Sequence, residues 1–186
     1  TDQTEWEKVK KFFPNKHVVT LPTPFFNNVN NQGAYSLINT TNKIQYFLSG
    51  ILFSHYHYDK IELITKLLLD LHDEKGLIID GGLIYEKYLE IQRISKFSIN
   101  FYRHKNGMVT RAIDAANQGT IPIVHKNNIF LEYVNSAKKF SFTDNDDIKN
   151  LIKNCTEKDY SEYSSQIKRE VGKELNQKIC ATKYIK

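Results

Sequence analysis

Polar side chains gather at four places where a predicted strand gives way to the next segment. These segments are residues 50–59, 80–85, 102–108 and 125–132. Together with Lys60, which directly follows the first segment, they supply His55, His57, Asp80, Arg103, His104, Lys105 and Glu132. In an open parallel sheet the carboxyl ends of the strands meet at one edge, and ligands bind outside that edge. The spacing therefore predicts one polar site that several loops supply.

The basic run Arg103-His104-Lys105-Asn106-Gly107 is the strongest part of this set. It places three potential cations directly before a helix that is predicted to begin at Met108. A helix N-terminus presents free N–H groups and the positive end of the helix dipole, and an arginine side chain can bind phosphate through two N–H groups. The run predicts a diphosphate site, and the alternative is a solvated basic loop.

The helix that follows has one apolar face and one polar face. Its apolar residues recur at helical spacing, and they are Met108, Val109, Ala112, Ile113 and Ala116. Arg111 and Asp114 lie on the other face, either as ligand contacts or as an i,i+3 pair on a solvated surface. Gly119 supplies the left-handed residue that ends a helix. Residues 121–124 then form an apolar strand, with Pro122 at its start.

The helix, the turn and the strand also share a longer pattern. It reads R-x-x-[E/D]-A-x-x-x-G-x-I-P-I-V, and it is carried by Arg111, Asp114, Ala115, Gly119, Ile121, Pro122, Ile123 and Val124. This pattern resembles the C-terminal, nucleotide-sugar-binding domain of GT-B glycosyltransferases, in particular the exostosin-like and group 1 families. Further segments fit as well, and they are Ser95-Lys96-Phe97, Phe140-Ser141-Phe142 and Asp146-Asp147-Ile148. The resemblance covers residues 43–154.

The resemblance implies a Leloir-type transferase that moves a sugar from a nucleotide-sugar, with UDP as the expected nucleotide, to a glycan or lipid-linked acceptor. The donor would contact Arg103, Lys105, Asn106, Gly107, Met108, Arg111, Asp114, Lys60 and Glu132. No metal is required, because cationic side chains and a helix dipole can stabilise the leaving diphosphate. The catalytic base is expected in an N-terminal GT-B domain that is absent from this chain, so the chain alone is expected to be an inactive fragment.

Three positions depart from the family pattern. Group 1 enzymes carry two glutamates with seven residues between them, and Asp114 stands at the second position, which binds the ribose. Asn106 stands at the first position and cannot ionise, and Ile51 stands where an arginine often follows the glycine. These departures leave open an alternative, in which the chain is a non-catalytic α/β interaction or regulatory module that keeps the fold without donor chemistry.

Composition narrows the partners further. The 186 residues suffice for one sizeable domain, and 26 Lys+Arg against 21 Asp+Glu give a net charge of +5, which suits an anionic ligand. No clustered basic stripe is present, so no nucleic-acid partner is predicted, whereas peripheral contact with a membrane stays open. The two cysteines, Cys155 and Cys180, lie far apart and fit a reducing, cytoplasmic location. His55-x-His57 lacks a third ligand, so no metal site is predicted.

Strands and helices that alternate position these residues. Strands are predicted at 43–49, 76–79, 97–101, 121–124 and 139–142, and helices at 59–72, 85–94, 108–118 and 144–154, the last capped by Thr143. The alternation predicts a doubly wound, Rossmann-like α/β domain with a parallel sheet of five to six strands, the sixth at residues 17–21.

The organisation expected along the chain has three parts. Residues 1–42 are a connector with edge elements from an interdomain region, residues 43–159 are the Rossmann-like GT-B C-terminal domain, and residues 160–186 are a long C-terminal helix. That helix either packs on its own sheet or crosses to another domain.

Overall fold

A five-stranded parallel sheet forms the centre of the molecule. The computed structural model describes residues 44–50, 58–80, 83–101 and 110–176. The strands are β1 (Ile44–Gly50), β2 (Gly76–Asp80), β3 (Ser95–Ile99), β4 (Ile121–His125) and β5 (Ser141–Phe142), in the order β2-β1-β3-β4-β5. Every pairing is parallel. This confirms the doubly wound α/β fold, and each strand bound falls within two residues of its prediction. The sixth strand, predicted at 17–21, lies outside the described residues.

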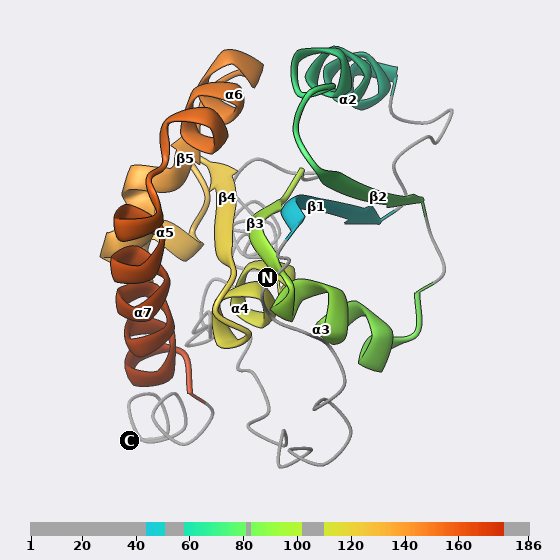
Figure 1. The fold of residues 1–186 in the computed structure, drawn as a ribbon. Helices are drawn as coiled ribbons and strands as arrows, with labels where there is room; N and C mark the ends of the chain where they lie inside the picture. The colour runs from blue at the N-terminus through green and yellow to red at the C-terminus, as the bar shows by residue number, and fades with distance from the viewer. Residues whose placement is uncertain (1–43, 51–57, 81–82, 102–109, 177–186) are drawn as a thin grey trace, which may run out of the picture.

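Helices cover both faces of the sheet (Figure 1). They are α2 (Tyr58–Asp70), α3 (Tyr85–Arg93), α4 (Thr110–Asn117), α5 (Phe130–Tyr133), η1 (Asn135–Phe140), α6 (Asn145–Asn154) and α7 (Glu157–Glu174), of which η1 is a 3-10 helix. α2 and α6 lie on one side of the sheet, and α3 and α4 lie on the other (Figure 1).

The side chains of β1 show how the two faces are filled. Phe47 packs with Tyr88 and Leu89 of α3, whereas Tyr46 and Leu48 join the main core. Successive residues of a strand point to opposite faces, so a continuous apolar run is what a strand covered by helices on both sides requires.

The segment between β4 and β5 differs from the prediction. It contains α5 and η1, which the sequence analysis missed, and they shorten the strand expected at 139–142 to Ser141–Phe142. The carboxamide of Asn128 accepts a hydrogen bond from the backbone N–H of Phe130 at 3.0 Å and so starts the first turn. The buried residues that follow are Phe130, Leu131, Val134, Ala137 and Phe140. Their spacing is helical, which is the physical reason for the correction.

The start of α6 also differs. The sequence suggested Thr143 as the cap, but Asp144 is the N-cap, and its side chain accepts a hydrogen bond from the backbone N–H of Asp147 at 3.0 Å. The Asp147 carboxylate accepts the N–H of Asp144 in return, which completes a capping box. An aspartate at the third helical position takes the place of the usual glutamate.

α7 runs beside the β4–β5 end of the sheet and packs on its own domain (Figure 1). Its buried residues Tyr160, Ile167 and Val171 belong to the main core, and the helix contacts α4, η1 and β4. The helix spans Glu157–Glu174, whereas the prediction was 160–186, so it begins earlier and ends earlier than expected. It begins at Glu157 because Thr156 caps it through a bond from the Asp159 N–H at 3.1 Å. Of the two expected positions, the structure has the helix on its own sheet.

The turn after α4 is tied to α7. Gly119 has a φ of +80°, as predicted for the residue that ends the helix. Its carbonyl accepts hydrogen bonds from the hydroxyls of Tyr160 at 2.9 Å and Ser164 at 2.6 Å. Within the described ranges, no helix combines the length and the apolar character that crossing a membrane would need.

Candidate functional site

The strand order places a reversal point between β1 and β3. From β1 the chain goes to β2 on one side, and it then returns to β3 on the other side. In doubly wound sheets the ligand crevice lies outside the carboxyl ends of the strands at this reversal. The six-stranded dinucleotide-binding sheet has the strand order 3-2-1-4-5-6, and removal of its third strand, which lies at the edge, leaves the order seen here. The candidate crevice therefore lies outside Gly50 of β1 and Asn100, which follows β3.

α4 reaches this crevice through Arg111. The half-buried guanidinium donates a hydrogen bond from Nη1 to the carbonyl oxygen of Ser49, at the carboxyl end of β1. Gly50 next to it has a φ of +130°, and a Cβ there would lie 3.3 Å from Cζ of Arg111 and nearer still to Nη1. The positive φ favours glycine at this position, because a residue with a side chain is strained there, and a Cβ would also displace the Arg111 guanidinium. The side chain of Arg111 thus lies directly against the strand end at the reversal point.

The charge of Arg111 is not neutralised by the carboxylate nearest to it in sequence. Among the ion pairs of the described residues, none joins Arg111 to Asp114. The i,i+3 surface pair that the sequence allowed is therefore not formed. Arg111 turns to the strand, and Asp114 turns to α3.

Asp114 lies across from the first residue of α3. The hydroxyl of Tyr85 donates a hydrogen bond to Oδ1 of Asp114 at 3.0 Å. Ile113 and Ala116 on the same helix are fully buried in the core, as the helical spacing predicted. Burial raises the pKa of the Asp114 carboxyl, and the Tyr85 hydrogen bond only partly opposes this. Burial, with the Asp114 charge as the second cause, raises the pKa of Tyr85 to about 12.

A buried polar network holds α3 against α4 and β3. The Tyr88 hydroxyl donates to the backbone carbonyl of Arg111 at 3.4 Å. Gln92 is 1% exposed, and its amide donates to the Tyr88 oxygen at 2.9 Å and to the Ser98 hydroxyl at 3.0 Å. Asn100 donates to the backbone carbonyl of Ser98 at 2.8 Å. The network fixes the first turn of α4 at the crevice.

The structure brings together only part of the predicted site. Arg111 and Asp114 lie one helical turn apart on α4 without contacting each other, Arg111 against the end of β1 and Asp114 against α3. Glu132 is exposed on α5, which packs on η1 and α7. Lys60 lies in the first turn of α2, but its side chain is outside the described residues, as is that of Asp80 at the end of β2. The remaining predicted residues lie wholly outside the described ranges, and they are Arg103, His104, Lys105, Asn106, Gly107, Met108, His55 and His57.

Sequence reasoning missed the side chains that hold Arg111 and Asp114. Tyr85, Tyr88 and Gln92 looked like ordinary positions of an amphipathic helix. One signal was available, since Tyr85 is the first helical residue after a strand end and so belongs to the ligand edge. In the described ranges, no group of three or more His, Cys, Asp and Glu side chains could hold a metal ion.

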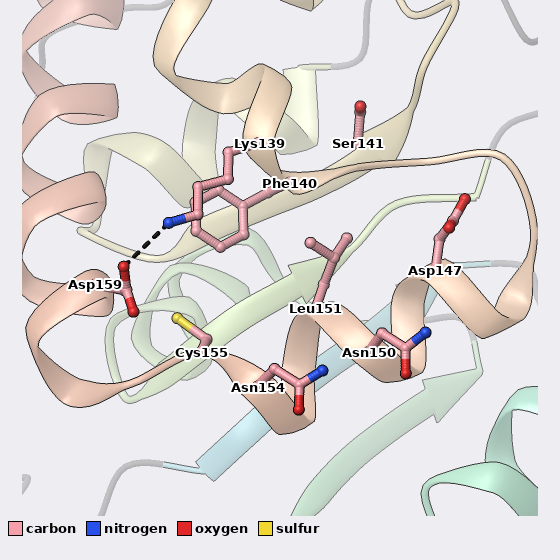
Figure 2. A pocket seen from close by; sticks show the side chains of 9 residues that line it. All are labelled: Lys139, Phe140, Ser141, Asp147, Asn150, Leu151, Asn154, Cys155 and Asp159. Carbon is pink, nitrogen blue, oxygen red and sulfur yellow. Dashed lines mark hydrogen bonds and ion pairs between the residues drawn. The ribbon is translucent and has the colours of Figure 1, made fainter.

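A separate pocket lies beside β5 (Figure 2). In the sheet, β3 and β4 separate β5 from β1. Its volume is about 320 Å³, and it is lined by Lys139, Phe140, Ser141, Asp147, Asn150, Leu151, Asn154, Cys155 and Asp159. Its charged groups already have partners, since the Asp147 carboxylate accepts the backbone N–H groups of Thr143 and Asp144. Lys139 bonds Asp159 at 3.0 Å and lies 4.2 Å from the ring centre of Tyr163. These contacts stabilise the junction of η1, α6 and α7, and the pocket is not at the crevice.

Comparison with family models, curated proteins and solved structures finds no match to this chain. The candidate site therefore depends on the described geometry and on the sequence pattern. The geometry consists of a strand reversal, a guanidinium on the strand end, and a partly desolvated carboxylate one helical turn away.

Proposed function

We propose that this chain is the donor-binding domain of a GT-B glycosyltransferase, with a nucleoside diphosphate, UDP first, bound in the crevice between β1 and β3. The observation that carries the proposal is the position of the Arg111 guanidinium on the carboxyl end of β1. A cation there lies beside the N-terminus of α4, where free N–H groups and the helix dipole both favour an anion.

The diphosphate would bind to the guanidinium and to the first turn of α4. One N–H of Arg111 donates to the Ser49 carbonyl. Among the described residues the other donors of the planar fork form no hydrogen bond, and a phosphate would bind to them. The family pattern expects a basic residue directly after Gly50, where this chain has Ile51. Arg111 brings a cation to the same strand end from α4, so the departure in sequence does not remove the charge.

Asp114 would accept a hydrogen bond from a ribose hydroxyl. Its Oδ1 already accepts the Tyr85 hydroxyl, while Oδ2 keeps its full capacity as an acceptor among the described contacts. Partial desolvation of a charged carboxylate lowers the stability of the fold. Groups of this kind cluster at functional sites. The proposed transfer needs an acceptor and a base from a second domain, so the domain proposed here would supply donor binding and leaving-group stabilisation.

A calorimetric titration of the whole chain with UDP and with inorganic diphosphate tests the proposal. Both ligands should bind, and Arg111→Lys should weaken both by at least about tenfold, because lysine keeps the charge but loses the two-pronged contact. Arg169→Lys, an exposed position on α7, is the matched control and should change neither affinity. Failure of both ligands to bind the wild-type chain would refute the proposal and favour a non-catalytic interaction module.

A further inference from the structure

Tyr85 presents a large aromatic surface at the ligand edge of the sheet. It is the first residue of α3, directly after the loop that leaves β2, and it is 56% exposed. Its neighbour Ile84 is 65% exposed. A tyrosine ring offers a large contact area with a polar hydroxyl at its tip, so Tyr85 can contact a ligand at this edge.

The ring of Tyr85 is held in one orientation. One face stacks on the ring of Tyr88, with centroids 6.2 Å apart and an angle of 23° between the planes. The hydroxyl is fixed by the 3.0 Å hydrogen bond to Asp114. Tyr88 is itself buried and held by Gln92 at 2.9 Å. The outer face of Tyr85 is therefore a flat, pre-organised surface that loses little entropy when a ligand covers it.

Hydrogen-bond acceptors border this surface. They are the carboxylate of Asp114 and the phenol oxygen of Tyr85, which donates its hydrogen to Asp114 and keeps lone pairs as an acceptor. A wholly apolar ligand would desolvate the carboxylate without giving Oδ2 a hydrogen bond, and an anionic ligand would be repelled by the carboxylate charge. A ring with an apolar C–H face and hydroxyl groups at its rim can cover the aromatic face of Tyr85 and also donate hydrogen bonds to the acceptors at its border.

We infer that Tyr85, with Asp114, forms a platform for a sugar ring, which stacks its C–H face on the outer face of Tyr85 and donates a hydroxyl to Asp114. The sugar ring is either the ribose of a nucleotide or a pyranose of the transferred or accepting glycan. The inference rests on the proposed function, because it places this ring beside the proposed diphosphate site. It makes Tyr85 a ligand-contacting residue, which the family pattern does not mark.

Titration of the whole chain, with its tyrosine rings labelled with carbon-13 for NMR, tests the platform. The probes are uridine, for the ribose, and the methyl glycosides of glucose, galactose, mannose and N-acetylglucosamine, for the pyranose. At least one probe should shift the Tyr85 ring signals in the wild type. Tyr85→Leu should weaken that binding by about tenfold, because an aliphatic side chain replaces the stacking surface. Tyr85→Phe keeps the ring and should weaken it by only about threefold.

Ile84→Ala is the matched control, since it removes neighbouring exposed apolar surface without removing a ring. Its affinity should equal that of the wild type. If no probe shifts Tyr85, or if Tyr85→Leu binds as well as the wild type, the platform does not exist. If the platform test fails but UDP still binds, the proposed function is still supported. If a glycoside binds but UDP does not, the proposed function is refuted and the platform is supported.

Discussion

Replacing Asp114 with asparagine separates a functional carboxylate from a structural one. The substitution removes one charge and keeps a side-chain oxygen that can still accept the Tyr85 hydrogen bond. Burial raises the pKa of the Asp114 carboxyl in the folded state above its ordinary value. Between the ordinary and the raised pKa, the folded protein binds more protons than the unfolded chain, so this residue makes stability fall as pH rises through that window.

The sign of the effect at neutral pH follows directly. Above the window, the charged Asp114 lowers the stability of the fold, and Asp114→Asn removes that cost. We expect the melting temperature of the variant at pH 7 to equal or exceed that of the wild type, by up to about 3 °C, since 1 kcal/mol corresponds to about 2–4 °C in a chain of this size. Below the ordinary pKa of an aspartate, Asp114 is protonated in both the folded and the unfolded chain, and the two melting temperatures should converge.

The same substitution should weaken ligand binding. A hydrogen bond from a ribose hydroxyl to a charged carboxylate contributes about 1.5–3 kcal/mol, so UDP affinity should fall by about 10- to 150-fold. Affinity for inorganic diphosphate, which has no ribose, should not fall. Thermal unfolding in both pH ranges and calorimetric titration with both ligands provide the measurements.

Asp146→Asn is the control, because Asp146 is an exposed acid in the first turn of α6. It should leave both affinities unchanged. The reasoning is refuted if Asp114→Asn lowers the melting temperature by several degrees and leaves UDP affinity unchanged. In that case the carboxylate would serve the fold through Tyr85 alone.

The remaining predictions concern glycines, a helix cap and the basic loop. Gly50→Ala should destabilise the fold by about 1–3 kcal/mol, because Gly50 has a φ of +130°. Gly172→Ala should stabilise the fold by about 0.4–1 kcal/mol, because a Cβ at Gly172 meets nothing within 4 Å. Thermal unfolding measures both effects, and equal effects would contradict the geometry at the end of β1. Asp144→Ala should cost about 1 kcal/mol, whereas Thr143→Ala should cost little, and denaturant unfolding that reverses this ranking would contradict the observed capping box. Arg103→Ala should weaken UDP binding by about 1.5–3 kcal/mol, and unchanged affinity in a calorimetric titration would show that the basic run does not contact the donor.

The alternation of strands and helices was readable from the sequence for a physical reason. Parallel strands covered on both faces are nearly continuous apolar runs, and β4 is buried along its whole length. The turn at Gly119 was also predictable, because glycine is the residue that most readily takes the left-handed conformation observed there. The sequence analysis missed the two helices between Phe130 and Phe140. Their buried residues have helical spacing, but α5 has 4 residues and η1 has 6, and such short helices do not show a clear period in the sequence.

The candidate site was predictable in part. The helical period placed Arg111 and Asp114 on the polar face of α4, but it could not say what each side chain meets. The partners come from distant parts of the chain, Ser49 for Arg111 and Tyr85 for Asp114. Such contacts depend on how α3 and α4 pack side by side on the sheet, and a periodicity in one helix contains no information on its neighbour.

Amide NMR mapping with UDP tests the proposed crevice most directly. In a titration of the nitrogen-15-labelled chain, the largest shifts among the described residues should fall on Gly50, Thr110 and Arg111, at the end of β1 and the first turn of α4. Inorganic diphosphate should shift the same amides, and UDP should in addition shift Asp114. Shifts confined to the pocket along α6, or the absence of any shift at millimolar UDP, would contradict a nucleotide site at the reversal point of this sheet.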